Sequence, residues 1–510
     1  MNSRTLAERT AHAKADHPPG LSPLLRVQGY GMATESRSYY CEPRSVAEIK
    51  EILAYARRRG LTVGLRGTGC SYGDASINEG GIVLSCAKMN RILDWDPETG
   101  ILHAEGGVTI EQAWKTGIPD HYWVPVVSGT MFPTLAGAAS MNIHGKNAWK
   151  AGTLSDYILE LTLMLPSGEL VRCSRTEEPE LFHAALGGFG MLGIITEVKL
   201  KLKKVPGGRL RVYGLCAPNL RDLITEFERL APTSDYLVGW IDFFAKGDAL
   251  GRGIIHAANF VGPEEDPRAL ETFDVEKQVV PAKIAGLVPM TALGDGLRLF
   301  AHDPGMRLVN WGKYWSTRLL GDRKSYYQSH GAYHFLLDYI PNWKNIYKPG
   351  GFIQYQTFVP FTDAERTLRR LWVTCHKRGI TPWLGVFKRH KDDPYLMTHA
   401  VDGYSVAMDI GVQDHNRAKV WDLSHELDEI LINAGGRLYF AKDATMRPEI
   451  LERMYRPERV AAFRKMKERC DPEGVLQTNL SRRIGVSRPG RAPAASAPAR
   501  AARKPVKKKK

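Results

Sequence analysis

Two glycine-rich segments constrain the fold of this 510-residue chain more than any other feature of its sequence. The first is residues 66–74 (RGTGCSYGD), and the second is residues 126–153, which are mainly small. Glycine lets backbone lie close to a ligand and lets successive N–H groups turn toward one anion. An ordinary tight loop explains the first segment equally well when it is taken alone. The second segment repeats the theme, and together they predict backbone wrapped around a diphosphate-bearing ligand.

A third glycine motif, residues 188–193 (GFGMLG), fits the G-x-G-x-x-G pattern of dinucleotide-binding turns. Such a turn follows a strand and opens a helix, whose N-terminus meets the pyrophosphate. Here the pattern predicts a helix over residues 180–186 and a strand over residues 193–203. The context therefore excludes a Rossmann turn, and a P-loop motif is absent as well.

The length of the chain exceeds what one hydrophobic core supports, so at least two domains are expected. We predict an α+β fold with five segments: a polar leader (1–26), a ligand-binding domain (27–206), a substrate or cap domain on a mainly antiparallel sheet (207–435), a C-terminal segment returning to the first domain (436–486) and a disordered basic tail (487–510). In the first domain, Ser45 caps a helix over residues 45–60. In the second domain, the patterns predict strands over 236–244, 352–360, 383–387 and 404–410, with helices over 363–378 and 417–434.

The net charge of +15 is concentrated at one end of the chain. Nine cations and no acids lie in residues 487–510, and subtracting these nine leaves +6 for the rest. A solubilising tail is the first interpretation, and a tether to anionic lipid is the second. Nucleic acid is the least favoured partner, since the remainder shows no basic face with interleaved aromatic residues. The N-terminal residues lack the apolar core of a signal peptide, and no apolar run could span a bilayer. The expected location is cytoplasmic, with peripheral membrane attachment as the alternative.

Seven cysteines are scattered singly, without a C-x-x-C pair or a histidine at metal-ligand spacing. This pattern argues against a disulfide framework and against a zinc site, and no metal is predicted. Only Cys70, within the first glycine loop, lies where chemistry could use it.

Three ordered motifs resemble the FAD domain of the vanillyl alcohol oxidase superfamily, which has the p-cresol methylhydroxylase (PCMH) type of fold. These motifs are Gly67-x-Gly69-x-Ser71-Tyr72-Gly73-Asp74, Ser128-Gly129-Thr130 leading to Ile143-His144-Gly145-Lys146-Asn147, and Gly187-Gly188-Phe189-Gly190-x-x-Gly193-Ile194-Ile195. The resemblance implies a two-domain fold that binds FAD. The cofactor-binding residues that it implies are Arg66, Gly67, Thr68, Gly69, Cys70, Ser71, Tyr72, Gly129, Thr130, Thr134, Gly137, Ile143, His144, Asn147, Thr153, Ile194 and Lys442.

Within this superfamily the chain resembles the decaprenylphosphoryl-β-D-ribose oxidases, which oxidise a lipid-linked ribose at its 2-hydroxyl. The similarity covers residues 27–484 and includes Gln354-Tyr355-Gln356, Val386-Phe387-Lys388 and Gly435-Gly436-Arg437-Leu438-Tyr439-x-Ala441-Lys442-Asp443. The substrate residues that it implies are Gln354, Gln356, Lys388, Tyr333, His334 and Trp240. It also implies a partner short-chain reductase that takes the product.

Oxidation of an alcohol carbon requires a proton acceptor, a hydride acceptor and a cation where negative charge develops on the flavin. Lys442 matches the family lysine that touches flavin and substrate, and Tyr439 is assigned beside it as the second catalytic residue. A surface lysine at a strand end is the alternative. Gln354 and Gln356, two positions apart, share one face of a strand and suit sugar hydroxyls, although solvent-facing amides fit the same spacing. Lys388 follows an apolar strand, so a substrate phosphate would compensate its charge unless it reaches solvent.

Two departures from the family pattern qualify the resemblance. Cys70 stands where covalent members carry the histidine that bonds the flavin, which predicts non-covalent FAD, with a cysteinyl bond as the alternative. Ala407 stands where the ribose oxidases carry a cysteine near the flavin. That cysteine is not the family's catalytic base, so the change leaves activity intact but weakens the substrate assignment.

The sequence therefore predicts an FAD-dependent oxidoreductase that dehydrogenates a CH–OH group, on a small-molecule sugar or a polyprenyl-phosphate sugar such as decaprenylphosphoryl ribose. One alternative is an aldonolactone oxidase or a sterol-reductase-like flavoenzyme of the same fold. Another is a non-catalytic basic protein that binds membrane or nucleic acid through its tail.

Overall fold

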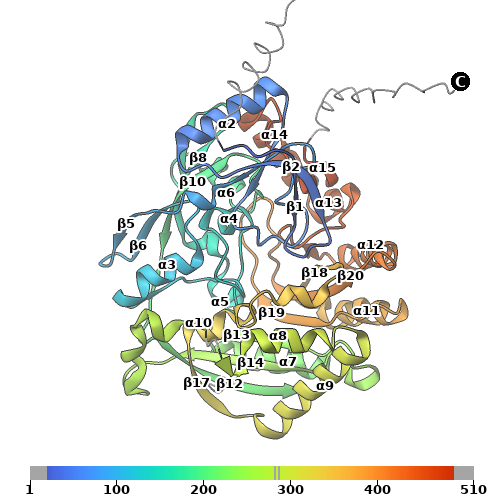
Figure 1. Cartoon of the computed structure of the whole chain (residues 1–510). Coiled ribbons are helices and arrows are strands. Elements are labelled where there is room, and N and C mark those ends of the chain that lie inside the picture. Colours follow the sequence, from blue (N-terminus) through green and yellow to red (C-terminus); the bar gives the residue numbers. More distant parts are fainter. Residues whose placement is uncertain (1–19, 281–282, 285–287, 488–510) are drawn as a thin grey trace, which may run out of the picture.

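The computed structural model describes residues 20–280, 283–284 and 288–487 (Figure 1). The predicted basic tail, apart from Ser487, and most of the predicted leader lie outside the described residues. The described chain forms an upper part built on two small sheets and a lower part built on one large sheet (Figure 1).

The first small sheet has the order β1 (Leu25–Gln28), β2 (Glu35–Cys41), β4 (Ile82–Ser85), β3 (Val63–Arg66). Helix α2 (Val46–Arg59) covers it with Ile49, Leu53 and Ala56, all fully buried. Its N-cap is Ser45, whose side chain accepts a hydrogen bond from the Glu48 N–H, and Gly60 ends it with φ of 64°. These termini confirm the helix predicted over residues 45–60.

The second small sheet is antiparallel, with the order β5 (Ile92–Asp96), β6 (Ile101–Glu105), β10 (Ile194–Lys201), β8 (Ile158–Met164), β9 (Leu170–Ser174). Helices α3 (Ile110–Gly117), α4 (Leu135–Ser140), α5 (Ala148–Ala151) and α6 (Pro179–Ala185) belong to the same part of the chain. Since α6 precedes the motif at residues 188–193 and β10 follows it, the exclusion of a Rossmann turn is confirmed.

The large sheet contains eight antiparallel strands in the order β17-β12-β14-β13-β19-β20-β18-β21. Their bounds are β17 (Ser325–Ser329), β12 (Arg209–Ala217), β14 (Gly253–Phe260), β13 (Tyr236–Ile241), β19 (Leu384–His390), β20 (Gly403–Val412), β18 (Gly351–Pro360) and β21 (Arg437–Leu438). The predicted antiparallel sheet is confirmed, although β12, β14 and β17 were not predicted. Helices α7 (Leu220–Leu230), α11 (Ala364–Lys377) and α12 (Arg417–Asn433) pack on one face through buried apolar residues such as Phe227, Leu371 and Leu427.

The opposite face of the large sheet looks toward the upper part of the molecule. At the β14 and β12 end, α9 (Asp303–Leu320) packs beside the sheet, with α8 (Met290–Arg298) and α10 (His330–His334) nearby. At the β18 end, the chain passes through β21 into the C-terminal segment.

The C-terminal segment contains α13 (Pro448–Met454), α14 (Pro457–Cys470) and α15 (Asn479–Arg483). It reaches the first sheet, where the Val63 N–H donates to the Val475 carbonyl at 2.7 Å and the Gln477 N–H donates to the Val63 carbonyl at 2.9 Å. Arg483 then pairs with Asp74 at 2.7 Å and with Asp443 at 2.9 Å. These contacts fix the first glycine loop and the chain around Lys442 relative to one another. Within the residues described, no helix has the length and apolar character needed to cross a bilayer.

Candidate active site

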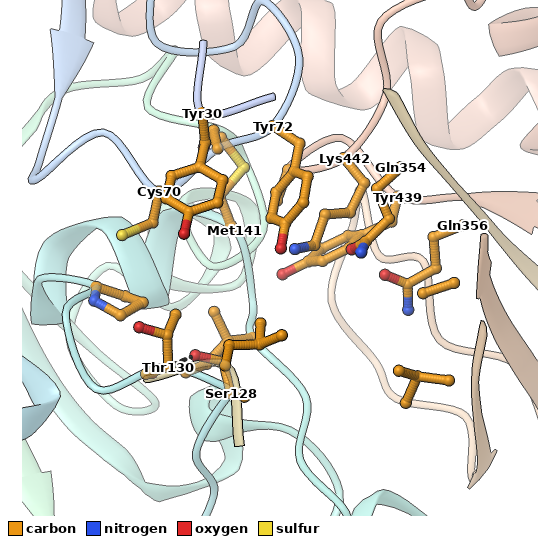
Figure 2. Close-up of a pocket in the computed structure, with 18 of the residues that line it drawn as sticks. Tyr30, Cys70, Tyr72, Ser128, Thr130, Met141, Gln354, Gln356, Tyr439 and Lys442 are labelled. Atoms are coloured by element: carbon orange, nitrogen blue, oxygen red, sulfur yellow. Dashed lines mark hydrogen bonds between the residues drawn. The ribbon is translucent and has the colours of Figure 1, made fainter. Parts of the chain in front are cut away.

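A cavity of about 720 Å³ lies between the two glycine-rich segments and the free face of the large sheet. In Figure 2, Tyr30, Cys70 and Tyr72 lie along one side, with Ser128 and Thr130 across from them. Gln354, Gln356, Tyr439 and Lys442 form the remaining wall. The cavity volume falls within the range typical of cofactor and ligand sites.

The first glycine loop is held rigidly and leaves its backbone donors free. Arg66 Nη1 donates to the carbonyls of Gln28 and Ser76, both at 3.2 Å. Gly69 has φ of +80°, and a Cβ there would lie 2.1 Å from the Arg66 guanidinium. Among the described residues, no acceptor receives the backbone N–H groups of residues 68–71. Four successive free donors beside a guanidinium are suited to a diphosphate.

The second glycine-rich segment is fixed by a residue that the sequence did not reveal. Thr130 Oγ1 donates to Asp338 Oδ1 at 2.7 Å, and the Met131 N–H donates to Asp338 Oδ2 at 2.9 Å. Thr134 caps α4 by accepting from the Gly137 N–H at 3.1 Å. The small residues of α4 and its cap therefore face the cavity, opposite the first loop.

Lys442 lies at the junction of the two parts of the molecule. The Tyr72 N–H donates to the Ala441 carbonyl at 2.8 Å, which joins the first loop to the segment carrying Lys442. The Lys442 ammonium lies 3.4 Å from the centroid of the Tyr72 ring. Burial lowers the pKa of Lys442 to about 7, while Asp409 opposes the shift. Lys442 therefore lines the cavity and is not a fully exposed surface lysine.

Asp409 on β20 is a carboxylate whose charge acts on Lys442, and no sequence motif pointed to it. Its carboxyl group is fully buried and accepts a hydrogen bond from Gln354 Nε2 at 2.5 Å. Burial raises the pKa of Asp409 to about 7, while Gln354 and Lys442 act in the opposite direction. At neutral pH, Lys442 and Asp409 both titrate, so this pair can hold or release a proton beside the cavity.

His144 and Gln356 form a second polar pair in the wall. Gln356 Nε2 and His144 Nε2 lie 2.9 Å apart, and His144 Nδ1 has no partner among the residues described. Burial, reinforced by Lys388, lowers the pKa of His144 well below 6.5. His144 is therefore a neutral imidazole, and its Nδ1 hydrogen is left for a ligand when Gln356 is the donor.

Two further lysines line the part of the cavity that lies away from the two glycine-rich segments. Lys388 lies within β19, rather than after it as predicted, and no carboxylate of the described chain pairs with it. Burial lowers its pKa to about 8. Lys313 on α9 places its ammonium 4.4 Å from the Trp240 ring centroid. Neither residue has the anionic partner that a partly enclosed ammonium needs.

Most of the predicted site residues line this one cavity. Every predicted cofactor residue except Asn147 and Thr153 does so, as do Lys442, Tyr439, Gln354, Gln356, Lys388, His334 and Trp240. The Asn147 side chain instead donates to the Pro125 carbonyl, and Thr153 caps a short 3₁₀ helix. The Tyr333 ring packs against Leu210, Val212 and Tyr236, away from the cavity.

Comparison with known proteins defines the class of this site. Residues 38–174 match the FAD binding domain family. Residues 38–174 are therefore an FAD-binding domain, as the motifs predicted, and the chain is similar to oxidoreductases of the vanillyl alcohol oxidase type. The residues present also fit the cofactor, because the free backbone donors of the first loop, Arg66 and the neutral His144 line one cavity of sufficient size.

Three individual relatives are similar to the chain over different shares of its length. The chain is 27% identical to decaprenylphosphoryl-β-D-ribose oxidase of Mycolicibacterium smegmatis over 86% of its own length and 92% of that protein. It is 30% identical to D-arabinono-1,4-lactone oxidase of Yarrowia lipolytica over 40% of the chain and 38% of that enzyme. It is also 30% identical to L-gulonolactone oxidase of Mus musculus over 34% of the chain and 38% of that enzyme.

Proposed function

We propose that this protein dehydrogenates a CH–OH carbon of a polyprenyl-phosphate sugar. The bound FAD supplies the hydride acceptor. The observation that carries the proposal is the order of side chains across the large sheet. Along this face, the hydrogen-bonding side chains of Gln354 and Gln356 are followed by the cation Lys388. Trp240 comes next, and an apolar exit beside α8 and α9 comes last.

The order follows directly from strand register. Gln356 on β18 lies opposite Ala407 on β20, and Val386 on β19 lies opposite the same Ala407. Val386 is in turn opposite Trp240 on β13. Since neighbouring strands are about 4.8 Å apart, Trp240 lies roughly 14 Å across the sheet from Gln356. Lys388, two residues along β19 from Val386, occupies the intermediate strand.

This spacing matches the parts of the proposed substrate. A sugar against β18 and β20 meets Gln354, Gln356 and the Lys442–Asp409 pair. A phosphate on its anomeric carbon then reaches β19, where it would compensate Lys388. A lipid chain continues past Trp240 toward α8 and α9. An aldonolactone has neither a phosphate nor a lipid, so it would leave Lys388 and the apolar exit without partners.

Lys442 and Asp409 are assigned the proton chemistry. Lys442 Nζ provides positive charge beside the site where negative charge develops, and a nearby anion would raise its pKa. Asp409, with a pKa of about 7, can exchange a proton with this group. Gln354 orients Asp409 through the hydrogen bond at 2.5 Å, and Gln356 orients His144.

We also propose that FAD is held without a covalent bond. Cys70 is the one cysteine in the loop, and burial raises the pKa of its thiol. A protonated thiol is a poor nucleophile, which disfavours a cysteinyl bond. The ketosugar product is proposed to pass to a partner short-chain reductase.

Anaerobic reduction of the FAD-loaded protein tests the proposal. Ribose linked through phosphate to a short polyprenyl chain should bleach the visible flavin band and yield one ketosugar per flavin reduced. Free ribose and an aldonolactone should react far more slowly. Bleaching by the aldonolactone, with an enol-lactone as product, would instead assign the protein to the lactone oxidases.

A further inference from the structure

Exposed apolar side chains are concentrated around α9. Leu308, Trp311, Trp315 and Leu319 are 57%, 51%, 39% and 76% exposed. They recur at intervals of three, four and four residues, so they form one stripe along the helix. Leu299 and Phe300, just before α9, extend the stripe, being 77% and 39% exposed. We call these six residues the α9 apolar face.

The opposite side of α9 is anchored in the protein. Met306, Asn310 and Tyr314 are buried, and Asn310 Nδ2 donates to the Trp383 carbonyl at 3.2 Å. Trp383 Nε1 returns a hydrogen bond to Asp303 Oδ1 at 2.8 Å. The helix is therefore apolar on both sides, and only one side is explained by the fold. An exposed apolar patch of this kind marks a contact surface.

The charged residues around the α9 apolar face indicate what covers it. Residues 298–324 carry six lysine and arginine residues against two aspartates. Arg307, Arg323 and Lys324 are exposed, and within the described chain no carboxylate pairs with them. Tryptophan with leucine on one face and cations at its edges is the composition of a helix that lies in an anionic membrane interface.

The same helix forms part of the cavity wall. Met306, Val309 and Lys313 line the cavity from its inner side, together with Leu297 of α8. Lys313 is both a lining residue and exposed, so the cavity reaches the surface beside α9. In Figure 1, α9 lies along the lower edge of the molecule, at the end opposite α2 and α14.

We propose that the α9 apolar face is a membrane-docking surface that seats the mouth of the cavity on an anionic lipid bilayer. A lipid-linked substrate would then enter along the inner side of the same helix, without its chain crossing water. This entry route rests on the proposed function, whereas the docking itself does not.

Vesicle binding by the full FAD-loaded chain tests the docking surface. The probe is vesicles of phosphatidylcholine mixed with phosphatidylglycerol, and the variant combines Leu308→Ser, Trp311→Ser and Leu319→Ser. Its partition onto vesicles should fall by about tenfold or more, since three apolar side chains lose their lipid contact. The matched control, Leu93→Ser with Leu170→Ser, removes exposed leucines from the upper part and should bind like the unaltered chain.

The basic tail needs its own control, because it also attracts anionic lipid. Replacing Lys507, Lys508, Lys509 and Lys510 by glutamine should leave the effect of the α9 variant in place. Brominated lipids should quench fluorescence that is lost in a Trp311→Phe, Trp315→Phe variant. Binding that depends on the tail alone, or quenching that is the same in both chains, would overturn the proposal.

A second copy of the chain is the competing occupant. If the unaltered protein dimerises, the α9 variant is monomeric and both bind vesicles equally, the surface is a dimer interface and the proposal fails. Flavin reduction by a short-chain, water-soluble substrate should be unchanged in the α9 variant. Absence of that reaction in every chain, with vesicle binding intact, would refute the proposed function but not the docking surface.

Discussion

Replacing Lys442 with methionine should impair catalysis while it stabilises the FAD-free protein. The pKa of Lys442 falls from 10.5 to about 7 on folding. At about pH 7.5, Lys442 keeps its proton in the unfolded chain but has lost it in most folded molecules. This pH lies about three units below the pKa of the unfolded chain. At about 1.36 kcal/mol per unit, this lysine costs about 4 kcal/mol of folding free energy.

Part of this gain is offset by Asp409, which loses its cation. Because Asp409 already has a pKa of about 7, it is partly protonated at that pH, and completing its protonation costs at most about 1 kcal/mol more. We therefore expect methionine to raise the free energy of unfolding by about 3 kcal/mol. Between about pH 7 and pH 10.5 the unfolded chain binds more protons than the folded chain, so wild-type stability rises with pH and the gain from methionine shrinks.

Urea unfolding of the FAD-free protein across this pH range measures the stability change. Stopped-flow reduction of the FAD-loaded variant should be about 10²- to 10³-fold slower, as when one preorganised charge-stabilising group is removed. Lys150→Met, which removes a half-exposed ion pair with Asp235, is the control and should change both quantities little. A methionine variant that reduces flavin at the wild-type rate, or that is less stable than wild type, would refute the reasoning.

Three further changes test other parts of the site. Asp409→Asn should reduce the loss of stability between about pH 4 and pH 7, because in that range only the folded chain keeps the Asp409 proton. Thermal unfolding at both pH values measures this, and a pH dependence equal to that of the wild type would contradict the prediction. Gly69→Ala should weaken FAD binding by about tenfold or more, as titration of the FAD-free protein would show, since its Cβ meets Arg66; Gly80→Ala, at a φ of +70° with open space, is the control. Lys388→Met should raise KM for the phosphorylated substrate about 10- to 100-fold with little effect on kcat. Equal KM values in the variant and the wild type would show that Lys388 does not bind the phosphate.

Local sequence signals predicted the elements whose ends are fixed by neighbours along the chain. Ser45 and Gly60, for example, delimit α2. Helix α9 was not predicted, although Met306, Asn310 and Tyr314 recur at helical spacing on its buried side and could have indicated it. Strands β12 and β14 pair with each other along their whole lengths, and this pairing, rather than local pattern, defines them.

The site residues show the same contrast between local sequence signals and contacts between distant parts of the chain. The glycine loops, Lys442, Gln354 and Gln356 were found because their motifs are contiguous. Asp338 was missed because it contacts Thr130 from 208 positions away, which no local pattern records. Asp409 does carry a signal that could have been used, since it is an ionisable residue inside an otherwise apolar strand pattern. Tyr333 was predicted beside the substrate, yet it does not line the cavity and instead packs behind the lining residues Lys146 and His334.

The most direct test of the account is anaerobic mixing of the FAD-loaded protein with a short-chain polyprenyl-phosphate ribose, followed by identification of the sugar product. We predict rapid bleaching of the flavin band and formation of a ketosugar, with both slowed about 10²- to 10³-fold in Lys442→Met. A flavin that stays oxidised with this substrate, but is reduced by a sugar lactone that lacks phosphate, would contradict the account.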